Sequence, residues 1–170
     1  MRAFLAAAFG LLAVGLLIGA FLSLTPSAVG GAVMPPFSLE RLQGGRVAPS
    51  ELRGKIVIID FWATWCPPCR EEMPWLVKMA KRFESRGVVF LAISEDDPPG
   101  QVPLVTAFAR EVPGLERFAL LGNPEIETAY GVTSLPTLFV LDREGRLVET
   151  FVGSADEATV VALVERLAAP

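Results

Sequence analysis

The chain has two cysteines, Cys66 and Cys69, and they stand three positions apart. At the start of a helix, thiols with this spacing lie on adjacent turns and can close a small disulfide ring. No cysteine remains for a separate structural disulfide, so we expect this pair to open and close. The helix dipole and its unpaired N–H groups favour a thiolate at Cys66, which we expect to stay accessible and to attack a substrate disulfide. Cys69, one turn further in and more buried, would then resolve the mixed disulfide.

Pro67 and Pro68 separate the two cysteines. They suit a first helical turn, where missing N–H groups cost little, yet they remove two donors that could have bonded the Cys66 sulfur. The N–H of Cys69 is the nearby backbone donor that remains. We therefore expect the Cys66 pKa to be lowered only moderately and the couple to be fairly reducing, because a strongly stabilised thiolate makes a strong oxidant with a potential near about −120 mV.

Two acidic residues are candidates for handling the proton of Cys69. Asp60 follows the β-branched run Ile56–Ile59 and shares a strand face with Ile58, so it should be buried with a raised pKa. Glu72 lies three residues after Cys69, on the same helical face. The alternative for Glu72 is an acid at a helix start, favoured by the helix dipole alone.

Local patterns predict the elements that position these side chains. Lys55–Trp62 is typical of a buried central strand, Cys66–Arg86 of a helix and Val88–Ser94 of a second strand, which together form a β-α-β unit. The other predicted elements are a hairpin of Phe37–Arg41 and Arg46–Ala48, a turn at Ser50–Arg53, a loop at Glu95–Pro103, a helix at Leu104–Glu111, a strand at Phe118–Leu121, a helix at Glu125–Tyr130, a hairpin of Thr137–Leu141 and Leu147–Val152, and a last helix from Asp156 to Ala168. This order predicts an α/β fold with a central mixed β-sheet flanked by helices and preceded by a β-hairpin.

The N-terminal segment differs from the rest of the chain. Residues 3–24 carry no charge, and Arg2 is the one charged residue ahead of them. The segment is long enough to cross a hydrocarbon core of about 30 Å, and a secretory h-region is usually shorter. We predict a transmembrane helix within residues 1–25, with a cleaved signal segment as the alternative, then a Pro/Gly-rich linker at 26–36 and a folded domain at 37–170. The positive N-terminus would stay in the cytoplasm and the domain would lie outside.

Composition argues against several other functions. The chain has no histidine, which excludes a Cys–His nucleophilic pair, a Ser–His–Asp triad and haem attachment through Cys-x-x-Cys-His. Two thiolates are too few for a zinc site, and no glycine-rich NAD or flavin motif is present, so we expect no cofactor. The net charge of −4 argues against a nucleic-acid partner.

Asp60–Cys69, with the sequence DFWATWCPPC, resembles the active-site segment of thioredoxins. Together with Pro35–Leu39, Glu71–Pro74 and Tyr130–Thr137, it is similar to the TlpA/ResA-type membrane-anchored, thioredoxin-like thiol–disulfide oxidoreductases. The resemblance runs from about Pro35 to the C-terminus and implies a thioredoxin-like fold.

The resemblance also assigns roles to single residues. It makes Asp60 the buried acid behind the resolving cysteine and places Glu72 along the active site. It implies that Pro136 is cis and lies beside the disulfide, so that the backbone of Leu135 can pair with substrate. The alternative is an ordinary trans proline that starts a strand. On its own position next to the motif, Trp65 is expected at the exposed rim with Pro67 and Pro68, in contact with partners.

We therefore expect an extracytoplasmic thiol–disulfide reductase of client proteins that carry cysteine pairs. By resemblance, such clients include apocytochrome c and copper-site assembly proteins, and the electrons come from a membrane-embedded donor. One alternative is a copper-binding chaperone that uses the thiolates as soft ligands. The other is a disulfide-forming oxidase of the same fold.

Overall fold

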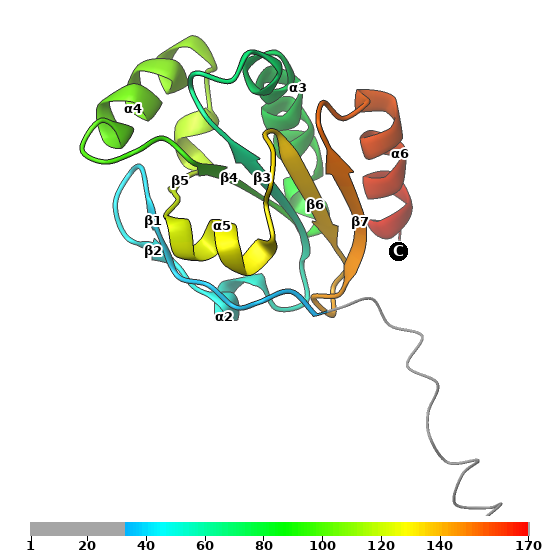
Figure 1. Cartoon of the computed structure of the whole chain (residues 1–170). Coiled ribbons are helices and arrows are strands. Elements are labelled where there is room, and N and C mark those ends of the chain that lie inside the picture. The colour runs from blue at the N-terminus through cyan, green and yellow to red at the C-terminus, as the bar shows by residue number, and fades with distance from the viewer. Residues whose placement is uncertain (1–32, 170) are drawn as a thin grey trace, which may run out of the picture. The chain divides into compact units, whose positions relative to one another are not determined.

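A computed structural model of the chain describes residues 33–169 (Figure 1). The strands are β1 (Leu39–Arg41), β2 (Arg46–Val47), β3 (Ile56–Trp62), β4 (Val88–Ser94), β5 (Ala119–Leu121), β6 (Thr137–Leu141) and β7 (Leu147–Val152). The helices are α2 (Pro49–Leu52), α3 (Pro67–Phe83), α4 (Gln101–Glu111), α5 (Pro124–Tyr130) and α6 (Glu157–Leu167), with 3-10 turns at Glu84–Arg86 and Leu115–Arg117.

The predicted membrane segment, residues 1–25, lies outside the described residues, and so does most of the predicted linker. Between residues 33 and 169, no helix combines the length and the apolar character needed to cross a membrane.

The strands form one mixed sheet in the order β2-β1-β5-β4-β3-β6-β7. The central strand β3 pairs in parallel with β4, which pairs in parallel with β5. On its other side β3 pairs antiparallel with β6, and β6 with β7. The N-terminal hairpin β1–β2 joins the sheet through antiparallel pairing of β1 with β5. The predicted α/β fold with a mixed sheet and an N-terminal hairpin is therefore confirmed.

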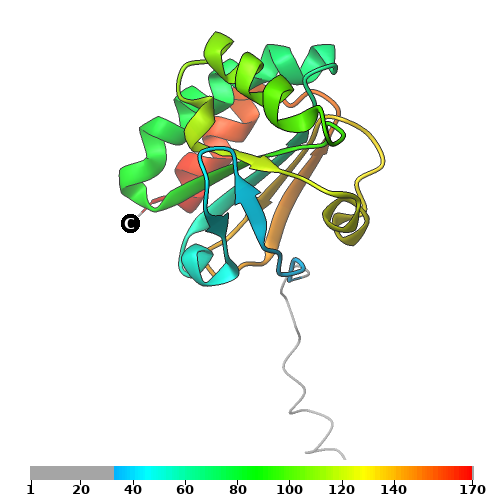
Figure 2. The same ribbon diagram turned by 90° about the vertical axis from the view of Figure 1, so that its left-hand side faces the viewer.

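Helices cover both faces of the sheet, with α3, α4 and α6 on one side and α5 on the other (Figure 2). Successive side chains of a strand point to opposite faces, so β3 contributes to two cores. Ile56, Ile58 and Trp62 pack with the first group of helices, and Val57, Ile59 and Phe61 pack with α5. Every residue of β3 is buried, and full burial of one of its isoleucine, valine or phenylalanine side chains stabilises the fold by about 1.5–3 kcal/mol.

Three predicted elements differ from the structure by three residues or in the type of element. The helix predicted from Leu104 begins at Gln101, so the predicted loop Glu95–Pro103 is shorter. Pro103 fits there because the N–H groups of a first helical turn have no partner within the helix. The predicted turn Ser50–Arg53 is the one-turn helix α2, and the helix predicted to reach Arg86 ends at Phe83 and continues as a 3-10 turn.

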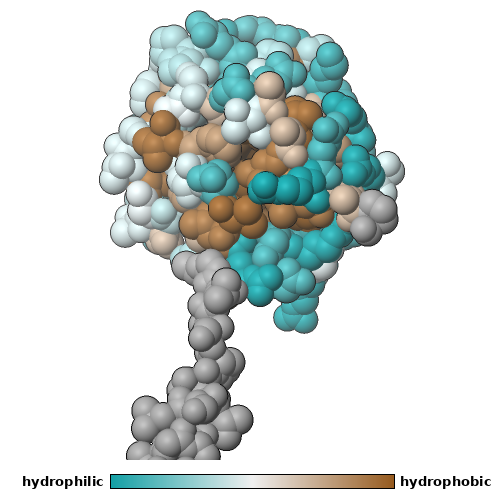
Figure 3. Space-filling model, turned by 90° about the vertical axis from the view of Figure 1, so that its right-hand side faces the viewer, coloured by the Kyte–Doolittle hydropathy of each residue, from teal (hydrophilic) through white to brown (hydrophobic). Residues whose placement is uncertain are grey.

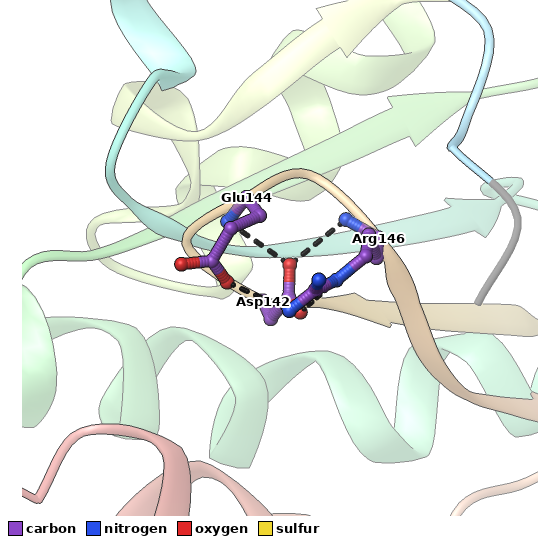
Figure 4. A network of polar contacts seen from close by, with 3 residues as sticks. All are labelled: Asp142, Glu144 and Arg146. Atoms are coloured by element: carbon purple, nitrogen blue, oxygen red, sulfur yellow. Dashed lines mark hydrogen bonds and ion pairs between the residues drawn. The ribbon is translucent and has the colours of Figure 1, made fainter. Parts of the chain in front are cut away.

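The turn between β6 and β7 is fixed by one carboxylate (Figure 4). Asp142 Oδ1 accepts the N–H groups of Glu144 at 3.0 Å and Arg146 at 2.9 Å, and Oδ2 accepts Arg146 Nε at 2.9 Å. Desolvation opposes ionisation of Asp142, but the hydrogen bonds from Arg146 and its positive charge outweigh this effect. The pKa of Asp142 is therefore lowered. This network confirms the predicted hairpin turn.

The last strand, β7, forms an edge of the sheet. Apolar side chains reach the surface in the middle of the face that carries β7 and α6 (Figure 3). Val152, at the end of β7, is 67% exposed. It pairs with Thr137, the residue that follows Pro136, so this part of the edge lies beside the predicted substrate-binding loop.

Candidate active site

Cys66 and Cys69 form a disulfide at the N-terminus of α3, with 2.02 Å between the sulfurs and 5.3 Å between the Cα atoms. Cys66 is the N-cap residue, and its sulfur accepts the N–H of Cys69 at 3.4 Å. The sequence predicts this donor, because Pro67 and Pro68 have no N–H group and Cys69 is the next residue. Cys69 is fully buried, as predicted, but Cys66 is only 4% exposed, so the expectation of an accessible sulfur was wrong for the disulfide form. In this form the sulfur is bonded to Cys69, and Cys66 belongs to the hydrophobic core cluster on the α3 side of the sheet.

Pro67 and Pro68 occupy the first two positions of α3. Proline fixes φ near the helical value, so it starts a helix readily. Cys66 in front of them is extended, with φ −92° and ψ 107°, which is the conformation that a residue before proline prefers. The helix therefore begins where the sequence predicts, and Pro67 is exposed while Pro68 is half-buried.

Asp60 lies in β3 and is completely buried. Neither of its carboxylate oxygens has a hydrogen-bond partner among the described residues. Its strand neighbours are Ala92 on β4 and Leu138 on β6, which offer no charge. Burial raises the pKa of Asp60 well above its usual value, and the nearby charge of Glu72 raises it further. The predicted burial and raised pKa of Asp60 are thus confirmed.

Glu72 also points into the protein and is 4% exposed. Burial raises its pKa to about 7, although the N–H of Ala155 donates to Oε2 at 3.1 Å and works in the opposite direction. Its other oxygen, Oε1, is buried without a partner in the described part of the chain. Its neighbour Glu71 is exposed. Neither Glu71 nor Glu72 lies in the first turn of α3, so the alternative of a helix-start acid favoured by the dipole alone does not account for Glu72.

The predicted substrate-binding residues differ in exposure. The Leu135–Pro136 peptide bond is cis, as the resemblance implies. Pro136 is buried, and its carbonyl accepts the N–H of Gly153 at 2.9 Å. Leu135 is half-buried and packs against the cores on both faces of the sheet. Trp65 is 67% exposed directly before Cys66.

The prediction missed a polar cluster around Thr64, in the turn between β3 and α3. Its N–H and hydroxyl both donate to Asp96, which follows β4, and its carbonyl accepts from Arg70 of α3. A signal for the first contact was present: β3 and β4 were both predicted, and neighbouring parallel strands end at the same edge of a sheet. In the observed register Trp62 pairs with Ser94, which places the residues that follow each strand side by side.

Three comparisons place these features among known proteins. Residues 31–150 match the model of the AhpC/TSA family. Thiol-disulfide oxidoreductase ResA of Bacillus subtilis is 32% identical over 131 residues, which are 76% of this chain and 71% of that protein. Thioredoxin-like protein YneN of the same organism is 35% identical over 124 residues, 73% of this chain and 72% of that protein.

The solved structures that resemble this chain belong to the same class of protein as its sequence relatives. A thiol:disulfide interchange protein of the thioredoxin family from Chlorobium tepidum superposes with a TM-score of 0.72 at 28% identity, over 85% of this chain and 100% of that one. DsbF of Mycobacterium tuberculosis, in mixed oxidised and reduced forms, gives a TM-score of 0.68 at 27% identity, over 77% of this chain and 94% of that one. The chain therefore belongs to the AhpC/TSA family, within which it is a ResA-type, thioredoxin-like thiol–disulfide oxidoreductase.

Proposed function

We propose that the chain is an extracytoplasmic reductase of protein disulfides. Its N-terminal segment, residues 1–25, would anchor it in the cytoplasmic membrane, and a membrane-embedded donor would supply its electrons. Its clients would be proteins with cysteine pairs, such as apocytochrome c or copper-site assembly proteins. The uncharged run of residues 3–24 and the membrane-anchored family that the motifs resemble support this location.

In the proposed cycle, the reduced protein transfers two electrons to the client. The Cys66 thiolate attacks a client disulfide, forms a mixed disulfide and releases one client thiolate. The Cys69 thiol gives up its proton, and its thiolate attacks the Cys66 sulfur. This step restores the Cys66–Cys69 disulfide and releases the second client thiolate, so the client gains two electrons and, after protonation, two protons. The membrane donor then returns two electrons to the disulfide.

Asp60 and Glu72 would accept the proton of Cys69. Both carboxyl groups are buried, and each has an oxygen without a hydrogen-bond partner in the described part of the chain. A base is most effective when its pKa lies near the working pH. The pKa of about 7 for Glu72 meets this condition.

Trp65, Pro67, Pro68, Leu135 and Pro136 would form the client-binding surface. Trp65 and Pro67 are exposed at the start of α3 and can reach a partner directly. Because Cys66 is buried in the disulfide form, a client would have to approach its sulfur closely.

One observation carries the proposed direction of electron flow. Within the described residues, the Cys66 sulfur accepts a single hydrogen bond, from Cys69 N–H, because Pro67 and Pro68 have no N–H to donate. A weakly stabilised thiolate makes the reduced form less stable and the couple more reducing.

The reduction potential tests this direction. Equilibration with glutathione or dithiothreitol should give a value well below the roughly −120 mV of the oxidant class, and a value near −120 mV would support a disulfide-forming oxidase instead. Pro68→Ala restores the N–H at the second helical position, which can bond an N-cap side chain. If that hydrogen bond contributes about 1.5–3 kcal/mol, the potential should rise by roughly 30–60 mV. Pro67→Ala is the matched control, because the first N–H of a helix does not reach the cap side chain.

A further inference from the structure

Thr64 lies two residues before Cys66, and all its polar atoms are held by side chains from other elements. Its N–H donates to both oxygens of Asp96, at 3.0 and 3.3 Å, and its hydroxyl donates to Oδ1 at 2.6 Å. Its carbonyl accepts from Arg70 at 3.3 Å. A residue in a surface turn is normally held by its own backbone or by water, so this arrangement ties the turn to the rest of the domain.

Asp96 is the principal anchor of Thr64. It follows β4, is 3% exposed and accepts the hydroxyl of Ser94 at 2.8 Å in addition to the bonds from Thr64. Its own N–H donates to the Ser94 oxygen at 3.2 Å. The carboxylate is thus buried, bonded on both oxygens and fixed in orientation by the strand end that carries it.

Arg70 holds the turn from the opposite side. Its guanidinium donates to Thr64, forms an ion pair with Glu111 of α4 at 2.7 Å and lies 4.4 Å from the centre of the Phe108 ring. Phe108 in turn packs on Trp62, with 5.2 Å between ring centres. Through Arg70 and Phe108, Thr64 is therefore connected to the hydrophobic core that also contains the disulfide.

A fixed Thr64 also restrains Cys66. Only Trp65 separates the two residues, and the Cys66 N–H closes the turn by donating to Ala63 at 3.2 Å. Thiol–disulfide exchange needs the attacking, central and leaving sulfurs to be aligned, and a small misplacement can cost up to about 100-fold in rate. A fixed orientation of the Cys66 sulfur should therefore increase the rate of exchange.

We propose that Asp96 is a positioning residue: by holding Thr64, it orients Cys66 and Trp65 for attack on a protein disulfide. This inference rests on exchange at Cys66 and is independent of the direction of electron flow. The reductase proposal can therefore fail on the potential of the unmodified protein while the positioning role stands, and the converse also holds.

Asp96→Asn and Thr64→Val test the proposal, with Thr64→Ser and Asp97→Asn as controls. Thr64→Ser keeps the hydroxyl, and Asp97→Asn removes the same charge from an exposed neighbour. Each variant is reduced and mixed with excess insulin to obtain the single-turnover rate. The rate of Cys66 alkylation by iodoacetamide is measured over pH, because a small reagent demands little alignment.

Asp96→Asn and Thr64→Val should lower the maximal rate of insulin reduction by at least about tenfold. The alkylation rate at the high-pH limit should stay within about twofold of the unmodified protein, as alignment and not thiolate reactivity is lost. Both controls should behave like the unmodified protein. The proposal is overturned if Asp96→Asn is no slower than Asp97→Asn, or if alkylation falls as much as insulin reduction does. If Asp96→Asn fails to fold, the same comparison between Thr64→Val and Thr64→Ser decides the matter.

Discussion

Asp60 and Glu72 are electrostatically coupled across the interface of β3 and α3: the charge on Glu72 raises the pKa of Asp60. Neither residue takes part in an ion pair found within residues 33–169. Burial without a cationic partner disfavours ionisation of both acids, so the folded protein keeps protons that the unfolded chain would release.

The burial of Glu72 predicts that the fold loses stability as pH rises. The pKa of Glu72 is about 7 in the folded protein against 4.5 for the ordinary side chain, so between these values the folded state binds the proton and the unfolded state does not. The free energy of unfolding decreases with rising pH wherever the folded state binds more protons than the unfolded state. A pKa shift of this size corresponds to a loss of roughly 3 kcal/mol. Urea unfolding of oxidised protein at pH 5 and pH 9 should show that Glu72→Gln removes a decline of this order.

The control is Glu71→Gln, which changes the same charge at the exposed neighbouring position. Its free energy of unfolding should follow that of the unmodified protein at both pH values. Equal pH dependence in the Glu72→Gln and Glu71→Gln variants would contradict the burial-driven pKa of Glu72.

The proposed proton transfer predicts a slow second step in Asp60→Asn. Loss of a general base typically costs about 100-fold or more, so the mixed disulfide with a client should live much longer while its formation changes little. Acid quenching at timed intervals, followed by gel separation of the mixed disulfide, measures both steps. Resolution within about twofold of the unmodified rate would remove Asp60 from the mechanism, whatever its pKa.

The exposed ring of Trp65 predicts a binding effect without a folding effect. Surface substitutions usually change stability by no more than about 0.5 kcal/mol, so Trp65→Ala should unfold like the unmodified protein. Its KM for a protein disulfide should rise several-fold, and its reduction potential should not move, because the ring does not bond the Cys66 sulfur. An unchanged KM would show that clients do not use this side chain.

Gly122 lies where β4 and β5 end, and a Cβ atom at this position would stand 2.4 Å from the carbonyl oxygen of Ser94 and 2.6 Å from Glu95 Oε1. The strand end must shift to accept it, so Gly122→Ala should destabilise the fold by about 1–3 kcal/mol. Gly100→Ala is the control, because its Cβ would meet its nearest atom at 3.5 Å. Thermal unfolding of the two variants gives the comparison, and similar melting temperatures would contradict the close approach at Gly122.

Local sequence signals were sufficient for the elements and for residues whose environment depends on one element. Asp60 could be predicted as buried because it directly continues a strand that is apolar on both faces. Cys66 could be predicted as the N-cap because two prolines follow it, and proline suits the first turn of a helix. These inferences need no knowledge of distant residues.

Contacts between distant segments were beyond these signals. Asp96 stands 32 residues after Thr64, in a segment whose prolines and acids predict a surface loop. Ala155, 83 residues after Glu72, donates a backbone N–H that no side-chain pattern marks. Cys66 belongs to a core cluster whose other members come from distant segments of the chain, so its burial could not be predicted from its position at a helix start.

Trapping of mixed disulfides tests the central assignment of Cys66 as nucleophile and Cys69 as resolving cysteine most directly. In Cys69→Ala the mixed disulfide has no resolving thiol, so client proteins should accumulate on Cys66 and appear after non-reducing electrophoresis and mass spectrometry. Cys66→Ala should accumulate none, because the Cys69 sulfur is fully buried. Accumulation in Cys66→Ala together with none in Cys69→Ala would contradict the account.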